Sequence, residues 1–175
     1  MKLFFFSLIL LTTICAKSQV AENLKLENKQ IVFEKVYVLD SLESSKVEKL
    51  LTLNIPKIQD LTGFSKTNEI IIAKIANATI DYRKYGGKWG NTSTILNYPF
   101  YCDVLIVWKD QKYRVTISNM YFSGNPLGTV KLSEIFTSNK GTEFDSSKIA
   151  KRALYYIDSY LSDLFKISTS TQNDW

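Results

Sequence analysis

The 175-residue sequence is long enough for one domain with a real hydrophobic core. Its hydrophobic fraction of 45% and charged fraction of 22% are typical of a globular protein and exclude a wholly disordered chain. The formal net charge of +5 is too mild to predict nucleic acid as a partner.

The N-terminal residues 1–18 have the pattern of a secretory signal peptide. A basic start at Met1-Lys2 precedes an apolar run at 3–14, and Ala16-Lys17-Ser18 is a small-x-small cleavage pattern. The apolar run is shorter than the roughly 20 residues that span a bilayer, so we expect no transmembrane segment in the mature chain. Cleavage would remove two lysines and no acid, which lowers the positive charge further. The next residues, 19–29, show no sustained period and predict a flexible leader.

This segment predicts export to the periplasm or the medium, with an uncleaved anchor as the alternative. A lipid anchor through Cys15 is disfavoured, because Ile14 rather than a small residue precedes that cysteine. After cleavage Cys102 would be the only cysteine, which excludes an internal disulfide. Cys102 lies in an apolar strand pattern, so we expect a buried, unreactive thiol.

The first predicted elements are a strand and a helix. Residues 30–39 are dense in β-branched and aromatic side chains and predict a strand. Ser45 and Glu48 have capping-box spacing ahead of an apolar pattern with helical period, which predicts a helix from Ser45. We expect this helix to kink or restart at Pro56 and to end near Gly63.

A second strand and a long connection follow. Residues 69–80 contain three successive isoleucines, which favour a strand over a helix. Residues 81–97 hold three of the seven glycines and have no clear period, so they predict an irregular connection.

Residues 98–122 predict the centre of the sheet, as two long strands joined by a two-residue turn at Asp110-Gln111. This register gives one nearly apolar face with the pairs Trp108–Tyr113, Ile106–Val115, Val104–Ile117 and Cys102–Asn119. The other face is mixed and has the pairs Val107–Arg114, Leu105–Thr116, Asp103–Ser118 and Tyr101–Met120. One side of the ribbon is therefore expected to be packed and the other partly exposed to water.

The remainder of the chain predicts a short edge strand, a loop and a long helix. Residues 127–132 fit the edge strand, and residues 133–144 a loop with one helical turn. The segment 145–147 caps an amphipathic helix that runs to about Lys166. The small polar tail, residues 167–175, predicts disorder.

This order of elements predicts a single α+β domain over residues 30–166. We expect two layers, with an antiparallel sheet of four to five strands and both helices on one face. Residues 31–36, the helix from Ser45 and above all Val107-Trp108-Lys109-Asp110-Gln111-Lys112-Tyr113-Arg114-Val115 resemble an exported bacterial family of unknown function with a TATA-binding-protein-like fold. The resemblance covers residues 30–122. It implies a curved sheet with helices on its convex side, and it implies neither an activity nor DNA binding.

The sequence offers no catalytic set, metal site or cofactor motif. It contains no histidine, which removes Ser–His and Cys–His nucleophiles and the commonest metal ligand. A single remaining cysteine cannot form a thiolate zinc site. Among the aspartates near the predicted sheet, Asp110 fits a turn and Asp81 a strand end. Asp103 stands mid-strand on the mixed face, where a bond to Ser118 or to a basic side chain explains it, and no second carboxylate is placed beside it.

The connection after the second strand, taken as residues 81–98, is the candidate binding surface, because it interleaves aromatic and basic side chains among glycines. Its candidate residues are Tyr82, Arg83, Lys84, Tyr85, Lys88 and Trp89. The alternative is that these aromatic rings fold back and cover the edge of the sheet.

These observations predict an exported, non-catalytic module that binds an envelope protein, peptide or glycan. One alternative is a carboxylate-based hydrolase that acts on envelope glycans, and another is a structural module that assembles through an edge strand.

Overall fold

The computed structural model describes residues 21–126 and 128–168. The predicted signal peptide at 1–18 and all but the first two residues of the predicted tail at 167–175 lie outside this part of the chain. No helix within the described residues is long and apolar enough to cross a membrane.

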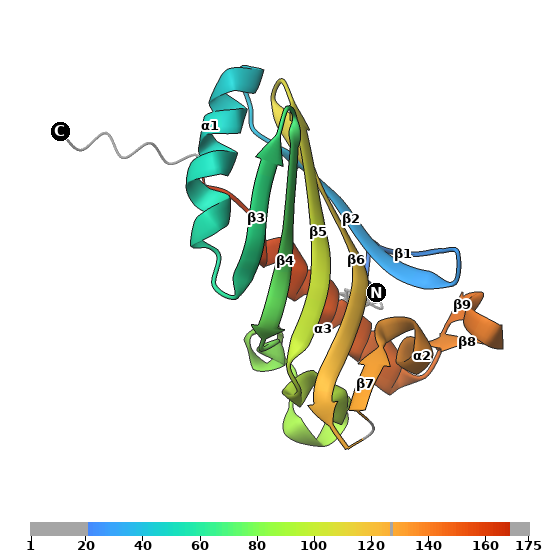
Figure 1. Cartoon of the computed structure of the whole chain (residues 1–175). Coiled ribbons are helices and arrows are strands. Elements are labelled where there is room, and N and C mark those ends of the chain that lie inside the picture. Colours follow the sequence, from blue (N-terminus) through green and yellow to red (C-terminus); the bar gives the residue numbers. More distant parts are fainter. Residues whose placement is uncertain (1–20, 127, 169–175) are drawn as a thin grey trace, which may run out of the picture.

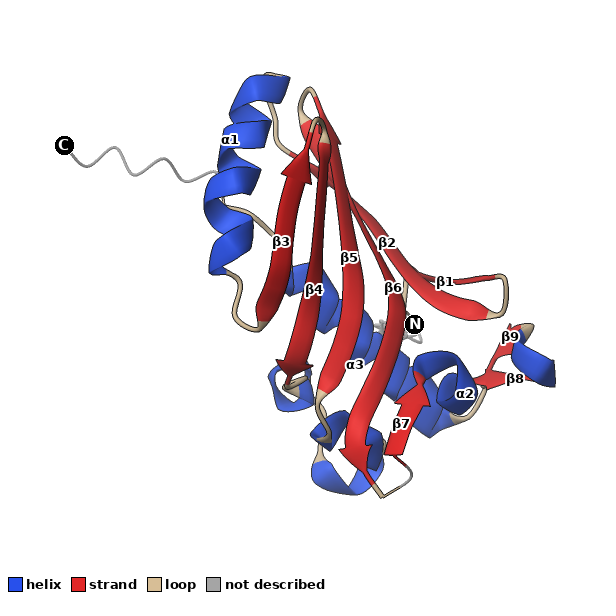
Figure 2. Ribbon diagram, in the orientation of Figure 1, coloured by secondary structure: helices blue, strands red, loops and turns tan. Residues whose placement is uncertain are grey.

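One antiparallel sheet forms the centre of the molecule (Figures 1 and 2). Its strand order is β1-β2-β6-β5-β4-β3. The seventh strand, β7, pairs with the end of β6 that β2 does not reach. The seven strands are β1 Leu24–Glu27, β2 Gln30–Val38, β3 Leu61–Thr67, β4 Ile70–Ala78, β5 Phe100–Lys109, β6 Lys112–Asn125 and β7 Gly128–Lys131. The α+β class is confirmed, whereas the expected number of four to five strands is wrong.

Three helices and several short elements complete the described part of the chain. The helices are α1 Ser44–Asn54, α2 Leu132–Phe136 and α3 Lys148–Leu164. A small second sheet pairs β8 Thr137–Ser138 with β9 Glu143–Phe144. The 3₁₀ turns are η1 Ile55–Lys57, η2 Tyr82–Tyr85, η3 Trp89–Asn91, η4 Thr94–Asn97 and η5 Asn139–Gly141. In Figure 1, α3 crosses the back of the sheet diagonally and α1 stands beside β3.

Two strands lie where the sequence predicted something else. The expected flexible leader at 19–29 contains β1, which pairs with β2. The expected helix ends at Asn54, ahead of Pro56, and β3 follows instead of further helix. Gly63 does not end a helix; its φ of 60° lies at an irregularity in the pairing of β3 with β4.

The predicted capping box does not form. Helix α1 begins at Ser44, and its backbone N–H donates to Asp110 Oδ1 over 2.7 Å. Glu48, the other half of the predicted box, forms an ion pair with Lys66 of β3. The turn of the central ribbon therefore caps a helix 66 residues away in the chain.

The central ribbon has the predicted two-residue turn and most of the predicted register. Six of the eight expected pairs are present, from Trp108–Tyr113 through Asp103–Ser118. The expected pairs Cys102–Asn119 and Tyr101–Met120 are wrong, because a β-bulge at Asn119 inserts one residue into β6. Asn119 has a left-handed φ of 51°, and Tyr101 lies opposite Tyr121 instead.

The predicted apolar face of the ribbon packs into the hydrophobic core. Five of its members are at most 2% exposed, namely Val104, Ile106, Trp108, Val115 and Ile117. Val47 and Leu51 of α1 and Ile157 and Leu161 of α3 join the same cluster, so both helices cover one face of the sheet, as predicted. Each fully buried side chain of this size contributes about 1.5–3 kcal/mol to folding.

Candidate functional site

The sheet face opposite α1 and α3, called the open face below, carries an unusual set of apolar side chains. Five large aliphatic residues on it are 38% to 65% exposed. This apolar patch consists of Val36, Val38, Ile70, Ile72 and Leu105. Ile70, Ile72 and Leu105 lie on the adjoining strands β4 and β5. Val36 and Val38 of β2 are separated from them by Arg114 and Lys112 of β6. Large apolar side chains exposed on one face of a sheet are a feature of interaction sites in soluble proteins.

The open face is basic at the end near the turn of the ribbon. Lys109 and Lys112 are directly opposite each other as the last pair of β5 and β6. Like charges in this arrangement repel, and neither lysine forms an ion pair with a carboxylate of the described residues. Arg114 has only a long contact of 4.0 Å with Glu34. These cations, with Val36 and Val107, line a shallow cavity of about 350 Å³.

Asp103 stands in the middle of the open face and is held by polar neighbours. Asn119 Nδ2 donates to Asp103 Oδ2 over 2.6 Å, and Lys74 Nζ lies 3.8 Å from Asp103 Oδ1. The bulge that displaces the register brings Asn119, rather than the opposite Ser118, to the carboxylate. The described residues contain no group of three metal-ligating side chains. The arrangement gives Asp103 a structural role in the bulge.

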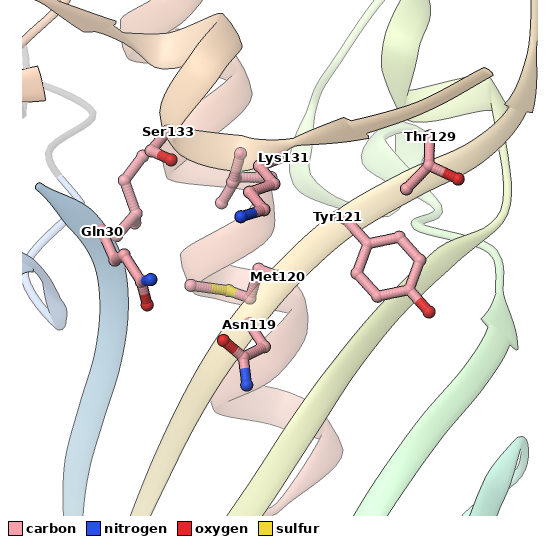
Figure 3. Close-up of a pocket in the computed structure, with 9 residues that line it drawn as sticks. Gln30, Asn119, Met120, Tyr121, Thr129, Lys131 and Ser133 are labelled. Atoms are coloured by element: carbon pink, nitrogen blue, oxygen red, sulfur yellow. The ribbon is translucent and has the colours of Figure 1, made fainter. Parts of the chain in front are cut away.

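A second cavity, of about 280 Å³, opens where β2 and β7 separate along the same edge of β6 (Figure 3). β2 pairs with β6 only up to Ile117, and β7 only from Tyr121 onward. The floor of the cavity is apolar, since Ile31, Met120 and Leu132 are at most 3% exposed. This cavity is called the β2–β7 pocket below.

The predicted binding residues of the 81–98 connection do not form one surface. Tyr82 is 5% exposed and packs against Tyr156 of α3, with ring centroids 6.3 Å apart. Lys84 Nζ and the Tyr85 hydroxyl both lie close to Asp163 Oδ2, at 2.8 Å and 3.1 Å. The hydrogen bond from Lys84 is the main reason that the pKa of Asp163 is lowered. These three residues therefore anchor the connection to α3.

The other predicted residues of the connection stay accessible. Arg83 and Lys88 are exposed, and Trp89 is 79% exposed, the highest value among the exposed large hydrophobic residues. The connection runs along α3 toward the N-terminal part of that helix. It begins where Lys84 bonds to Asp163, and farther along the Arg152 guanidinium donates to the Asn91 carbonyl at 3.4 Å. The exposed residues thus lie at the end of β5 away from Lys109, and Figure 1 shows these two ends far apart.

Sequence reasoning missed the apolar patch and the β2–β7 pocket. Val107 and Leu105 on the mixed face of the ribbon were a partial signal for the patch. Ile70 and Ile72 gave no signal for the patch, because the sequence does not show that their strand pairs with β5. The pocket depends on the bulge at Asn119, and the alternation of the sequence does not reveal that bulge.

Comparison with known proteins bears on the fold. No family model and no curated protein matches the chain. A TBP-like protein from Parabacteroides distasonis is similar in structure, with a TM-score of 0.53 and 11% identity over 81% of this chain and 94% of that one. A DUF4468 family protein from Bacteroides ovatus has a TM-score of 0.49 and 13% identity over 84% of this chain and 88% of that one. At such identities a structural likeness shows the fold alone, and the fold of this chain is TATA-binding-protein-like, as the resemblance of residues 30–122 implied.

Proposed function

We propose that the chain is an exported, non-catalytic binding module whose partner is an acidic, partly apolar segment of an envelope protein or peptide. The observation that carries the proposal is the apolar patch on the open face beside Lys109 and Lys112. Five large aliphatic side chains that remain exposed on one face of the sheet favour a protein surface as partner over a glycan.

The basic end of the open face supports an acidic partner. A carboxylate placed between Lys109 and Lys112 would relieve their mutual repulsion and gain two charge-assisted hydrogen bonds. A partner in extended conformation would set apolar side chains on Val36 and Ile70 while its acidic side chains reach the lysines. The binding energy would come mainly from the apolar contacts, and the charges would select the partner and speed its association.

The experiment is calorimetric titration with a synthetic peptide that alternates acidic residues with Val and Leu. The comparison peptide carries Lys in place of each acidic residue. We expect the acidic peptide to bind at least about tenfold more tightly, and the double variant Lys109→Glu, Lys112→Glu to lose this preference. The matched control is Lys148→Glu, Lys151→Glu, two exposed positions of α3 on the other side of the molecule.

Two outcomes would overturn this proposal. Equal binding of both peptides would show that the partner need not be acidic. Equal effects of the two double variants on binding would show that the open face is not the site. Trp89→Ala provides a further test, because a loss of binding there would move the site to the 81–98 connection, which stays a second proposed surface. Sizing at several concentrations would reveal a second copy of the chain as the occupant of the patch, which would also contradict the proposal.

Export is part of the proposal and rests on residues 1–18 alone. N-terminal sequencing of the mature protein tests it, with Gln19 expected as the first residue. An intact Met1 in the purified protein would contradict export through a cleaved signal.

A further inference from the structure

We infer that the β2–β7 pocket is a binding site for a small carboxylic acid with an apolar body. The pocket lies at the other end of the open face from Lys109, so the inference does not depend on the peptide partner proposed above. It rests on three features: a gap in the strand pairing, an apolar floor and a lone cation at the rim.

The gap is built into the sheet. On one edge of β6, β2 pairs up to Ile117 and β7 starts at Tyr121, so neither strand pairs with β6 between these two residues. In the same stretch, the bulge at Asn119 bends β6 where β5 holds its other edge. The cavity of about 280 Å³ is therefore a product of backbone geometry and is not created by one side chain.

The floor of the pocket provides apolar contacts. Ile31, Met120 and Leu132 approach from three different elements and belong to the hydrophobic core, so the floor is supported from below. The volume lies just under the range of about 300–1,000 Å³ that is usual for drug-sized ligands, which favours a compact molecule over a peptide or an oligosaccharide.

The rim of the pocket selects a negative charge. Lys131 is the only charged side chain in the lining, and its ammonium forms no ion pair with a carboxylate of the described residues. Figure 3 shows the Lys131 ammonium and the Gln30 amide turned toward one another across the space between β2 and β7. Both groups can donate hydrogen bonds, so together they can hold the two oxygens of one carboxylate. Asn119 is already used, because its amide donates to Asp103.

The test uses phenylacetate, neutral phenylacetamide and cationic phenethylamine as probes that share one aromatic body. The readout is the ¹³C methyl signal of Met120, which is simple to assign because the sequence has only two methionines. We expect phenylacetate to shift this signal in a saturable way, and phenylacetamide to bind at least about tenfold more weakly. Lys131→Leu should abolish this difference, Lys131→Arg should keep it, and Lys148→Leu on α3 should leave it unchanged.

Several results would overturn the inference. One is the absence of any shift of Met120 with millimolar phenylacetate in a protein whose thermal unfolding is normal. Another is an equal response to all three probes, which would mean that the pocket recognises only the aromatic body. A preference for phenylacetate that persists in Lys131→Leu would show that Lys131 is not the cation that recognises the carboxylate. None of these results would affect the peptide experiment, whose variants lie at the opposite end of the open face.

Discussion

The hydroxyl of Tyr113, in the central ribbon, donates a 2.6 Å hydrogen bond to the carbonyl oxygen of Phe165 just beyond α3. The same hydroxyl accepts a hydrogen bond from the backbone N–H of Ile167 at 3.1 Å. Burial raises the pKa of Tyr113 to about 12, so the hydroxyl remains protonated and can donate at neutral pH. One side chain therefore satisfies two backbone groups where the helix ends, and it fixes the last helix to the sheet.

Removing this hydroxyl should destabilise the protein without changing the open face. Tyr113→Phe keeps the ring, which stacks on Tyr37 at a centroid distance of 4.8 Å, but it leaves the two backbone groups without their partner. We expect a loss of about 1–3 kcal/mol in the free energy of unfolding, measured by urea denaturation. Tyr101→Phe, a half-buried position of the open face, is the control and should change stability by less than about 0.5 kcal/mol. Similar values for the two variants would contradict this role of Tyr113.

Asp158 should make the protein less stable as the pH rises. It is 6% exposed, and burial raises the pKa of its carboxyl, although hydrogen bonds from Asn23 and from the Glu22 backbone oppose the shift. Because the folded pKa lies above the unfolded one, the protonated form favours the folded state. This contribution is complete below the unfolded pKa, near 4, and is lost as the pH rises through the folded value.

The variant Asp158→Asn isolates this effect. It keeps an oxygen that can accept from Asn23, and it removes the ionisable carboxyl of α3 that faces the residues before β1. The difference in unfolding free energy between the variant and the parent protein should shift in favour of the variant from pH 4 to pH 7. Burying the new amide nitrogen costs the same free energy at each pH, so it does not affect how the stability difference changes with pH. A difference that is constant across the range would show that Asp158 does not titrate with folding.

The sequence specified the central ribbon well because both of its faces and its turn agree with one register. Residues from Trp108 to Asp103 alternate without interruption, and the turn at Asp110-Gln111 leaves only one pairing that buries Ile106 and Val115 together. The register failed beyond Asp103 because a bulge has no hydrophobic signature. Asn119 is one of the residues that tolerate positive φ, but asparagine is equally common in ordinary loops.

The strands β1 and β3 were not predicted, because neither has a clear pattern of its own. β3 is largely exposed and contains a glycine and polar residues, and its pairing with β4 stabilises it. The polar residues of β1 reflect its position at the sheet edge, where Lys25 forms an ion pair with Glu34 of β2. The patch and the pocket were missed for the same reason, since both depend on contacts between strands that are distant in the sequence. The accessible part of the predicted site, with Trp89, depends on local composition, which the sequence does contain.

Cys102 should react with thiol reagents only when the protein unfolds. It is 3% exposed on the buried face of β5, as its place in the strand pattern predicted, and burial strongly raises the pKa of its thiol. Both effects keep the reactive thiolate scarce and inaccessible. In a Cys15→Ser background, reaction with a chromogenic disulfide should be slow in buffer and should follow the urea unfolding transition. Complete reaction within seconds in buffer would mean that β5 opens locally.

Gly87 and Gly90 provide a matched pair for the packing of the 81–98 connection on α3. A Cβ atom at Gly87 would lie 2.7 Å from Tyr82 Cδ2, 2.8 Å from the Tyr82 carbonyl oxygen and 3.1 Å from Tyr156 Cε2, whereas a Cβ at Gly90 would meet nothing within 4 Å. The carbonyl belongs to η2, which Lys84 and Tyr85 tie to Asp163, so it cannot move without breaking that anchor.

Gly87→Ala should therefore lower the unfolding free energy by about 1–3 kcal/mol through overpacking, while Gly90→Ala should change it by less than about 0.5 kcal/mol. Because Trp89 lies between the two glycines, its fluorescence tells whether the connection detaches from α3 or the strain spreads into the core. Detachment should change the Trp89 emission in Gly87→Ala well below the urea concentration at which the buried Trp108 responds. In a Trp175→Phe background, additional Trp89→Phe and Trp108→Phe changes separate the two signals. Equal stability of the two alanine variants would contradict the close contact of Gly87 with Tyr82.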